Sequence, residues 1–150
     1  METLAFDLVV GGSLVLGSVV APALFASARS RAEAGTLFGT MLARFDGLAI
    51  FSVIVIVVTS IAKAFAFEVT GVPELRLVAR WVALTVLAAA TLYSSGYANP
   101  VARAIRAETA AFDDQPQGSV ALVEFARLHE RSRRAMSVAV VFGLVALFLG

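Results

Sequence analysis

The chain of 150 residues has no cysteine and a single histidine, His129, and only 15% of its residues are charged. The lack of cysteine excludes disulfides, thiolate metal sites and cysteine nucleophiles. One histidine excludes haem ligation by two histidines within one chain, although two His129 rings could meet in a dimer. The sequence also lacks a phosphate-binding loop, a nucleophile elbow and a metalloprotease helix. We therefore expect a non-enzymatic protein with no catalytic residue, no cofactor and no metal.

Apolar residues are what the chain has in excess. Hydrophobic residues make up 59% of the sequence, and the mean hydropathy is +0.88. Soluble domains are only about half apolar, and a short chain buries the smallest share of its surface. Lipid can cover this much apolar surface, whereas a soluble fold of this size cannot. The composition therefore predicts an integral membrane protein.

Four apolar segments, separated by charged stretches, predict four transmembrane helices. A helix needs about 20 apolar residues to cross the hydrocarbon core, and the last segment is the shortest, with 16 uncharged residues from Ala135 to Gly150. Glu2 and Asp7 precede the first segment and no basic residue does, which disfavours a cleavable signal peptide. We expect an all-α integral membrane four-helix bundle in a single domain, residues 1–150, with cytoplasmic helical extensions. The expected spans lie at about residues 6–28, 46–67, 76–98 and 134–150.

Basic residues are distributed unequally between the two sides of these spans. The stretches after the first and third spans carry nine arginines, whereas the opposite side carries only Lys63, Arg76 and Arg80. Because basic loops stay in the cytoplasm, we expect both termini outside the cell. The Ala- and Arg-rich composition suggests a bacterial protein, and hence the bacterial inner membrane. The expected partners are the lipid bilayer, anionic headgroups at the Arg-rich inner face, and a homo-oligomer or membrane protein partner, but no nucleic acid.

Small residues recur at every fourth position along the predicted spans. In a bilayer such rows let two helix backbones approach closely. The longest row belongs to the second span, and shorter rows belong to the first and fourth. We expect helix packing at Gly17, Ala21, Gly35, Gly39, Ala43, Gly47, Ala139 and Gly143.

Capping and turn residues mark the expected helix ends. Ser30 and Glu33 fit a capping box, so the second helix should begin one residue after Ser30. Pro73 suits the first position of the third helix. The stretch DDQPQGS, residues 113–119, predicts the turn of the long cytoplasmic loop. The fourth helix should then continue unbroken from about Ser119.

Polar residues at the cytoplasmic ends of the spans form a candidate cluster of Arg44, Asp46, Arg103, His129 and Ser132. Buried polar groups are costly unless hydrogen-bonded, so we expect His129 within hydrogen-bonding or water-bridged reach of Asp46, Arg44 or Arg103. This cluster is the strongest candidate for a ligand, and its arginines could hold an anion bidentately. The alternatives are that the arginines only anchor the protein to anionic lipid and that His129 is structural or simply exposed.

A second candidate charge cluster, Asp7, Lys63 and Arg80, falls near the outer helix ends. Such residues can pair with one another or extend to the membrane interface, so a structural role is expected. The central thirds of all four spans are uncharged. A proton-coupled exporter would need a carboxylate there.

Three stretches in order carry a resemblance to a known family. They are GGSLVLGSVVAPALF (residues 11–25), AEAGTLFGTMLARFDGLAIF (residues 32–51), and PVARAIRAE followed by FARLHERS. This order resembles a family of small uncharacterised bacterial four-helix membrane proteins related to the eukaryotic transmembrane protein 205 group. The resemblance covers about residues 8–149. It implies an integral membrane protein of four helices and carries over no catalytic residue.

Two functions remain open after these observations. The first is a non-enzymatic structural, accessory or oligomeric membrane bundle. The second is a small-molecule or ion transporter that acts as a homo-oligomer. A membrane-bound cofactor protein or enzyme is the least favoured, because the sequence offers no residues for that chemistry.

Overall fold

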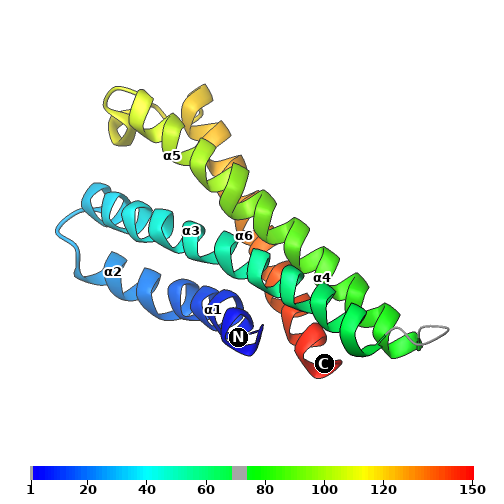
Figure 1. Cartoon of the computed structure of the whole chain (residues 1–150). Coiled ribbons are helices and arrows are strands. Elements are labelled where there is room, and N and C mark those ends of the chain that lie inside the picture. The colour runs from blue at the N-terminus through cyan, green and yellow to red at the C-terminus, as the bar shows by residue number, and fades with distance from the viewer. Residues whose placement is uncertain (1, 69–73) are drawn as a thin grey trace.

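The computed structural model describes residues 2–68 and 74–150, and its secondary structure over these ranges is entirely helical. The described chain forms four long helical segments joined by short connections (Figure 1). Their elements are α1 (Glu2–Val15), η1 (Leu16–Val20) and α2 (Ala21–Ser27), then α3 (Arg31–Lys63) and η2 (Ala64–Glu68), then α4 (Leu75–Tyr93), η3 (Ser94–Ala98) and α5 (Asn99–Glu108), then the short η4 (Phe112–Asp114) and α6 (Val120–Phe148).

Three helical stretches among the described residues are long and apolar enough to cross a membrane: Thr3–Ser27, Arg31–Ala66 and Leu75–Glu108. They overlap the first three expected spans by residue number, and their length and composition indicate a membrane protein. In α6, three arginines (Arg131, Arg133 and Arg134) directly precede the apolar run. The uncharged part of α6 is therefore shorter than the about 20 residues that a span needs, and the fourth span stays a prediction.

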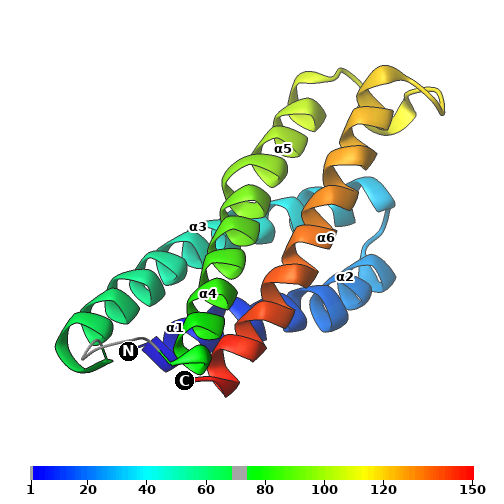
Figure 2. The same cartoon turned by 90° about the vertical axis from the view of Figure 1, so that its right-hand side faces the viewer.

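The helical segments lie side by side with their ends sorted into two groups (Figures 1 and 2). The two ends of the described chain lie at one end of the molecule, which we call the terminal end. The α2–α3 and α5–α6 connections lie at the other, which we call the loop end. α6 packs along α4 and also contacts α1 and α5, while α1 packs against α3. From the terminal end toward the loop end, α2 and α3 diverge from α5 and α6 (Figure 1).

The main core lies nearer the terminal end, where side chains from all four segments meet. Phe6 and Val9 of α1, Ile56 of α3, Leu87 of α4 and Ala139 of α6 are each buried there. Many large apolar side chains, among them those of α3 and α6 that face away from the core, remain exposed. Their exposure suits a lipid environment, because lipid removes the cost that water would impose on apolar surface.

The small-residue row of α3 does not pack as its spacing predicted. Ala43 and Gly47 are exposed, and a Cβ added to Gly39 or Gly47 would meet no atom within 4 Å. α3 instead buries Phe45 and Ala49, which are offset from the row by two positions. At 3.6 residues per turn that offset is about 200°, so Ala43 and Gly47 lie on the opposite face of the helix, whereas Gly35 and Gly39 line a pocket. One chain therefore brings no neighbouring helix against Ala43 and Gly47, and packing of this row stays a prediction.

Of the other small residues predicted to pack, some are buried or closed in and others face open space. Ala139 and Gly143 of α6 are buried, and a Cβ on Gly143 would lie 2.6 Å from Cγ2 of Val10. Gly35 is closed in by the Arg106 guanidinium, 2.8 Å from its Cβ position. On the first segment, Gly17 has no atom within 4 Å of an added Cβ. It faces a pocket rather than a helix, so the packing expected there is absent.

The predicted helix starts are confirmed where the structure describes them. α3 begins at Arg31, and Oγ of Ser30 accepts a hydrogen bond from the backbone N of Glu33 at 3.1 Å. The Glu33 carboxylate accepts from the backbone N of Arg29 at 3.0 Å, so the capping box reaches one residue further back than usual. α6 runs unbroken from Val120. Pro73 lies outside the described residues.

Wide π-helical turns precede two of the prolines. η1 ends just before Pro22, and η3 ends just before Pro100. Proline has no N–H and its ring conflicts with the carbonyl four residues earlier, so a regular helical turn cannot continue into it. An extra residue in the turn relieves this conflict. The η3 turn is the one that matters for the site, because it sets the direction of the side chains from Ser94 to Asn99.

Candidate functional site

A buried polar network joins three helical segments between the core and the loop end. Asp46 of α3 is 3% exposed. Its Oδ1 accepts a hydrogen bond from Nδ2 of Asn99 at 2.8 Å, and its Oδ2 accepts from Nη1 of Arg103 at 2.6 Å. Asn99 and Arg103 are one helical turn apart on α5 and therefore present their side chains on the same face. One carboxylate thus connects α3 to α5 through two donors.

Asn99 extends the network to α6. Its Oδ1 accepts a hydrogen bond from Oγ of Ser132 at 2.5 Å, and Oγ of Ser132 lies 2.7 Å from Oγ of Ser94. An amide side chain can donate and accept at once, so Asn99 connects the carboxylate to the hydroxyls. Ser94, Asn99 and Ser132 are all buried. Each of them is satisfied, which removes the cost of burying a polar group.

Arg103 balances the charge of the buried carboxylate. Its side chain is 31% exposed, whereas that of Asp46 is 4% exposed. A buried charge is tolerated when it is paired and hydrogen-bonded, and Arg103 supplies both the opposite charge and a hydrogen bond. The guanidinium has five N–H donors, and only Nη1 has a hydrogen-bond partner among the described residues. Arg103 also lines a pocket.

His129 lies beside this network rather than in it. It makes no hydrogen bond to Asp46, Arg44 or Arg103, and its ring stacks on Phe125 with centroids 6.1 Å apart and planes at 1°. Of the two contacts expected for His129, a direct hydrogen bond or a water bridge, the direct hydrogen bond is not formed; Asp46 accepts hydrogen bonds from Asn99 and Arg103 instead. The ring is open to the pockets, but surrounding protein atoms lower its pKa from 6.5 by desolvation, and the nearby charge of Arg133 lowers it further.

Arg44 is separate from the network. It is exposed and forms no hydrogen bond or ion pair with the described residues. Arg44 precedes Asp46 by two positions, which turns its side chain to the opposite face of α3. Of the five residues in the predicted cytoplasmic cluster, the structure connects Asp46, Arg103 and Ser132.

The predicted outer charges lie on three helical segments toward the terminal end. Asp7 is exposed on α1, Lys63 is half-buried at the end of α3, and Arg80 is buried in α4. Arg80 lies beside the chain end, since its Nε is 3.9 Å from a Cβ built on Gly150. Asp7 takes part in no hydrogen bond or ion pair with the described residues. The structure therefore does not join Asp7 to the two cations.

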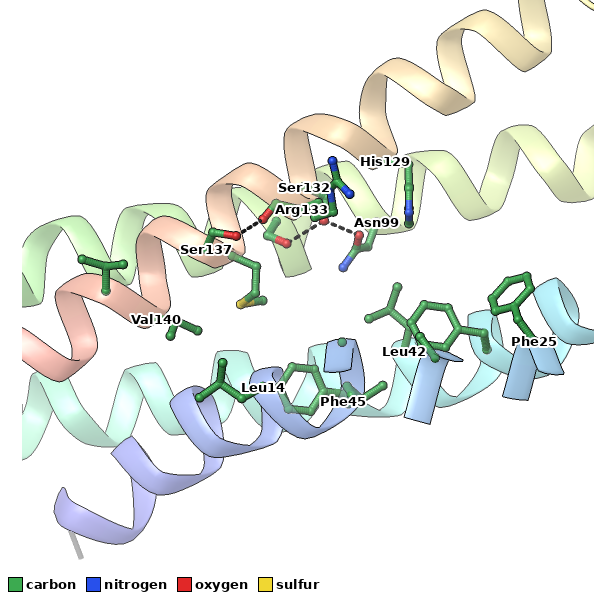
Figure 3. A pocket seen from close by; sticks show the side chains of 17 residues that line it. Leu14, Phe25, Leu42, Phe45, Asn99, His129, Ser132, Arg133, Ser137 and Val140 are labelled. Carbon is green, nitrogen blue, oxygen red and sulfur yellow. Dashed lines mark hydrogen bonds between the residues drawn. The ribbon is translucent and has the colours of Figure 1, made fainter. Parts of the chain in front are cut away.

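A pocket of about 520 Å³ opens where α1 and α2 separate from α6. Figure 3 shows apolar side chains such as Leu14 and Phe45 on one side of it, and the polar side chains of Asn99, Ser132 and His129 on the other. Volumes of about 300–1,000 Å³ are typical of ligand pockets, which are mostly apolar with a few placed polar groups. The pocket has both properties.

A second pocket of about 480 Å³ continues toward the loop end. It is the more charged of the two, with Arg31, Arg103, Arg106 and Asp113 in its wall. Five residues line both pockets, and we call the combined space the loop-end groove. The shared residues are Phe25, Phe38, Leu42, Asn99 and His129.

Ser94 and Asn99 are site residues that sequence reasoning missed. A signal was present in the stretch YSSGYANP, residues 93–100, where polar residues gather in an apolar span just before a proline. Polar side chains in a membrane helix bond to neighbouring helices. Among the described residues no group of three His, Asp or Glu side chains could hold a metal ion.

A family model described as "Domain of unknown function (DUF4149)" matches residues 4–111 of the chain. The match extends from α1 through α5 and ends before α6. It therefore includes Asp46, Asn99 and Arg103 but not His129 or Ser132. No curated protein matches the chain, and neither does any solved structure.

Proposed function

Because the chain belongs to the family described as Domain of unknown function (DUF4149), which names no activity, we propose a role based on the fold itself. The protein is a four-span bundle of the bacterial inner membrane with both termini outside. It acts without catalysis, as a structural or accessory component that contacts anionic lipid headgroups at its loop end. A relation to the eukaryotic transmembrane protein 205 group is part of the same proposal.

The main support for four spans is that both ends of the described chain lie at the terminal end (Figures 1 and 2). An even number of crossings brings the two ends to the same side of a membrane. α6 packs along α4 and contributes Ala139 and Ala146 to the main core. Its uncharged part after Arg134 has 14 residues and extends about 21 Å at 1.5 Å per residue, short of the ~30 Å hydrocarbon core.

The orientation follows from the arginines. Nine lie in the predicted cytoplasmic stretches, against three basic residues in the outer ones. Basic residues flanking the spans are retained in the cytoplasm, so the loop end is the cytoplasmic end. Each basic residue near an anionic leaflet contributes about 1 kcal/mol of attraction. The lipid bilayer is thus the first partner, and a second copy or another membrane protein is the next.

Single-cysteine labelling tests the orientation, because the native chain has no cysteine. Ser119→Cys and Thr70→Cys are each labelled in intact cells with a reagent that does not cross membranes. We expect labelling of Thr70→Cys and protection of Ser119→Cys until the cells are opened. Labelling of Ser119→Cys from outside would contradict the proposed orientation.

A transporter that acts as a homo-oligomer is the second candidate, and the loop-end groove favours it. The groove extends from the charged residues of the loop end to Leu14, which belongs to α1. A transporter must expose such a site to both sides in turn. Labelling of Gly17→Cys, a position in the groove, from both sides of oriented vesicles would support transport. Labelling from the loop side alone would favour the structural role.

A further inference from the structure

We propose that the loop-end groove binds one anionic phospholipid. Its phosphate lies in the charged compartment, near Arg31 and Arg103, and one acyl chain lies along the apolar wall toward Val141. The inference rests on the proposed insertion in a membrane, and it adds a defined site to the general attraction between arginines and headgroups. Three observations support it: the net charge of the groove, the concentration of that charge at the loop end, and the length of the groove.

The groove has more basic than acidic groups. Four arginines line it: Arg31, Arg103, Arg106 and Arg133. Three carboxylates form ion pairs with them: Asp46 with Arg103, Asp113 with Arg106, and Glu130 with Arg133 and also with Arg134. Arg31 has no carboxylate partner among the described residues. This excess of positive charge complements a phosphate diester, which carries one negative charge.

Arg103 is held in place for an anion. The pair with Asp46 fixes one guanidinium nitrogen at 2.6 Å, and Asn99 holds the carboxylate from the other side at 2.8 Å. Arg103 lines the loop-side pocket, and its other guanidinium N–H groups have no partner among the described residues. Planar guanidinium groups bind phosphate bidentately. A guanidinium already positioned by a buried carboxylate loses little freedom when it binds.

Charge is concentrated toward the loop end of the groove. Three of the four arginines, Arg31, Arg103 and Arg106, line the compartment near the loops, whereas the compartment near the core has Arg133 alone and is lined mainly by apolar residues such as Leu14, Leu16, Met136, Val140 and Val141. The imidazole of His129 lies where the two compartments meet. A molecule with a charged head and an apolar tail matches this order. A small hydrophilic anion would leave the apolar compartment empty.

The length of the apolar compartment matches one leaflet. His129 and Val141 are twelve residues apart on α6, which is about 18 Å at 1.5 Å per residue. One leaflet of the hydrocarbon core is about 15 Å thick, half of the full ~30 Å. An acyl chain of a membrane lipid therefore fits between the network and the core.

The test uses the full chain purified in detergent and native mass spectrometry. The protein is titrated separately with dioleoyl phosphatidylglycerol, which is anionic, and dioleoyl phosphatidylcholine, which is neutral overall. We expect one phosphatidylglycerol per chain at saturation, with an apparent affinity about fivefold or more above that for phosphatidylcholine. Equal affinity for the two lipids would overturn the proposal.

Glycine variants test the location of the lipid. Gly17 and Gly39 line the groove, and a Cβ on either would meet no atom within 4 Å. Gly17→Leu and Gly39→Leu therefore start from open space and place a branched side chain in the groove, and each should lower phosphatidylglycerol affinity about tenfold. Gly11 and Gly47 are equally open but do not line the groove, so Gly11→Leu and Gly47→Leu serve as matched controls. Unchanged affinity in both groove variants would place the lipid elsewhere and overturn the proposal.

A charge variant tests the headgroup position. Arg31→Gln removes a groove arginine, and Arg29→Gln removes an exposed one two residues away that does not line it. We expect a loss of about fivefold for Arg31→Gln and little change for Arg29→Gln. Equal losses would indicate general surface attraction and contradict the site. Cysteine labelling of the same protein reports orientation separately, so an external loop end would refute the proposed topology while leaving the groove result standing.

Discussion

Asp46 is the residue on which the site depends, because its buried carboxylate joins α3 to α5. Asp46→Asn leaves Arg103 without its partner, and Arg103→Gln leaves Asp46 buried without a counter-charge. Removing one partner of a buried pair costs about 3–5 kcal/mol. We expect each variant to lower the free energy of unfolding in detergent by about this amount. In a double-mutant cycle, the double variant should lose less than the sum of the two.

Arg44 provides the control for this experiment. It lies two positions before Asp46, but it is exposed and forms no ion pair with the described residues. Arg44→Gln should change stability by no more than about 0.5 kcal/mol. A loss as large as that of Arg103→Gln would mean that the cluster includes Arg44 after all.

His129 makes a pH-dependent contribution of a definite sign. Desolvation and the charge of Arg133 lower its pKa in the folded protein below the ordinary 6.5, while Glu130 opposes them. The unfolded chain therefore binds this proton more readily, and stability should fall as the pH drops below about 6.5 and through the folded pKa. Thermal unfolding of wild type and His129→Gln between about pH 8 and pH 5 measures this. An identical pH dependence in both proteins would contradict the shift.

At the scale of the element, a larger side chain should be tolerated at the exposed small residues of α3 but not at the buried Gly143 of α6. A leucine at Gly143 would push into Val10, whose Cγ2 lies 2.6 Å from the Cβ position. Overpacking of this kind costs about 1–3 kcal/mol, so Gly143→Leu should lower the melting temperature in detergent. Gly47→Leu and Ala43→Leu, on the exposed face of α3, should leave it nearly unchanged. Destabilisation by both of these would indicate that the row of α3 packs against a second copy.

The sequence predicted the helices far better than their contacts. Long apolar runs and the residues Ser30 and Ser119 determine where helices lie and begin, because hydropathy and capping are local properties. A row of small residues shows that one face permits close approach, but not that a neighbour is there. On α3 the neighbours pack against Phe45 and Ala49 instead. Which face of α3 is buried depends on how all four segments pack together, and this cannot be deduced from one helix.

Only part of the site could be predicted, because only some of its residues give a local signal in the sequence. Asp46, Arg103 and Ser132 are polar residues at the ends of apolar spans, which is a local signal. The connection through Asn99 depends on the wide turn of η3, which directs Ser94 and Asn99 toward α3 and α6. Pro100 signals a departure from regular helix, but not the direction in which the side chains then turn.

At the scale of the whole molecule, the number of crossings can be measured. With four spans, a cysteine at position 150 lies on the same side as one at position 70, and with three spans it lies on the opposite side. We expect Gly150→Cys to be labelled from outside intact cells like Thr70→Cys. Protection of Gly150→Cys, with Thr70→Cys still labelled, would mean that α6 does not cross the membrane.

The polar network also constrains the order in which the protein is made. Asp46 is separated from Asn99 and Arg103 by 53 and 57 residues of chain. At roughly 5–20 residues per second, a ribosome delivers Arg103 roughly 3 to 11 seconds after Asp46. During that interval neither Asn99 nor Arg103 is available to the carboxylate of Asp46. Docking of the third helical segment onto α3 then closes the first half of the network, and the arrival of Ser132 on α6 completes it, so the network is whole only when all three segments are in place.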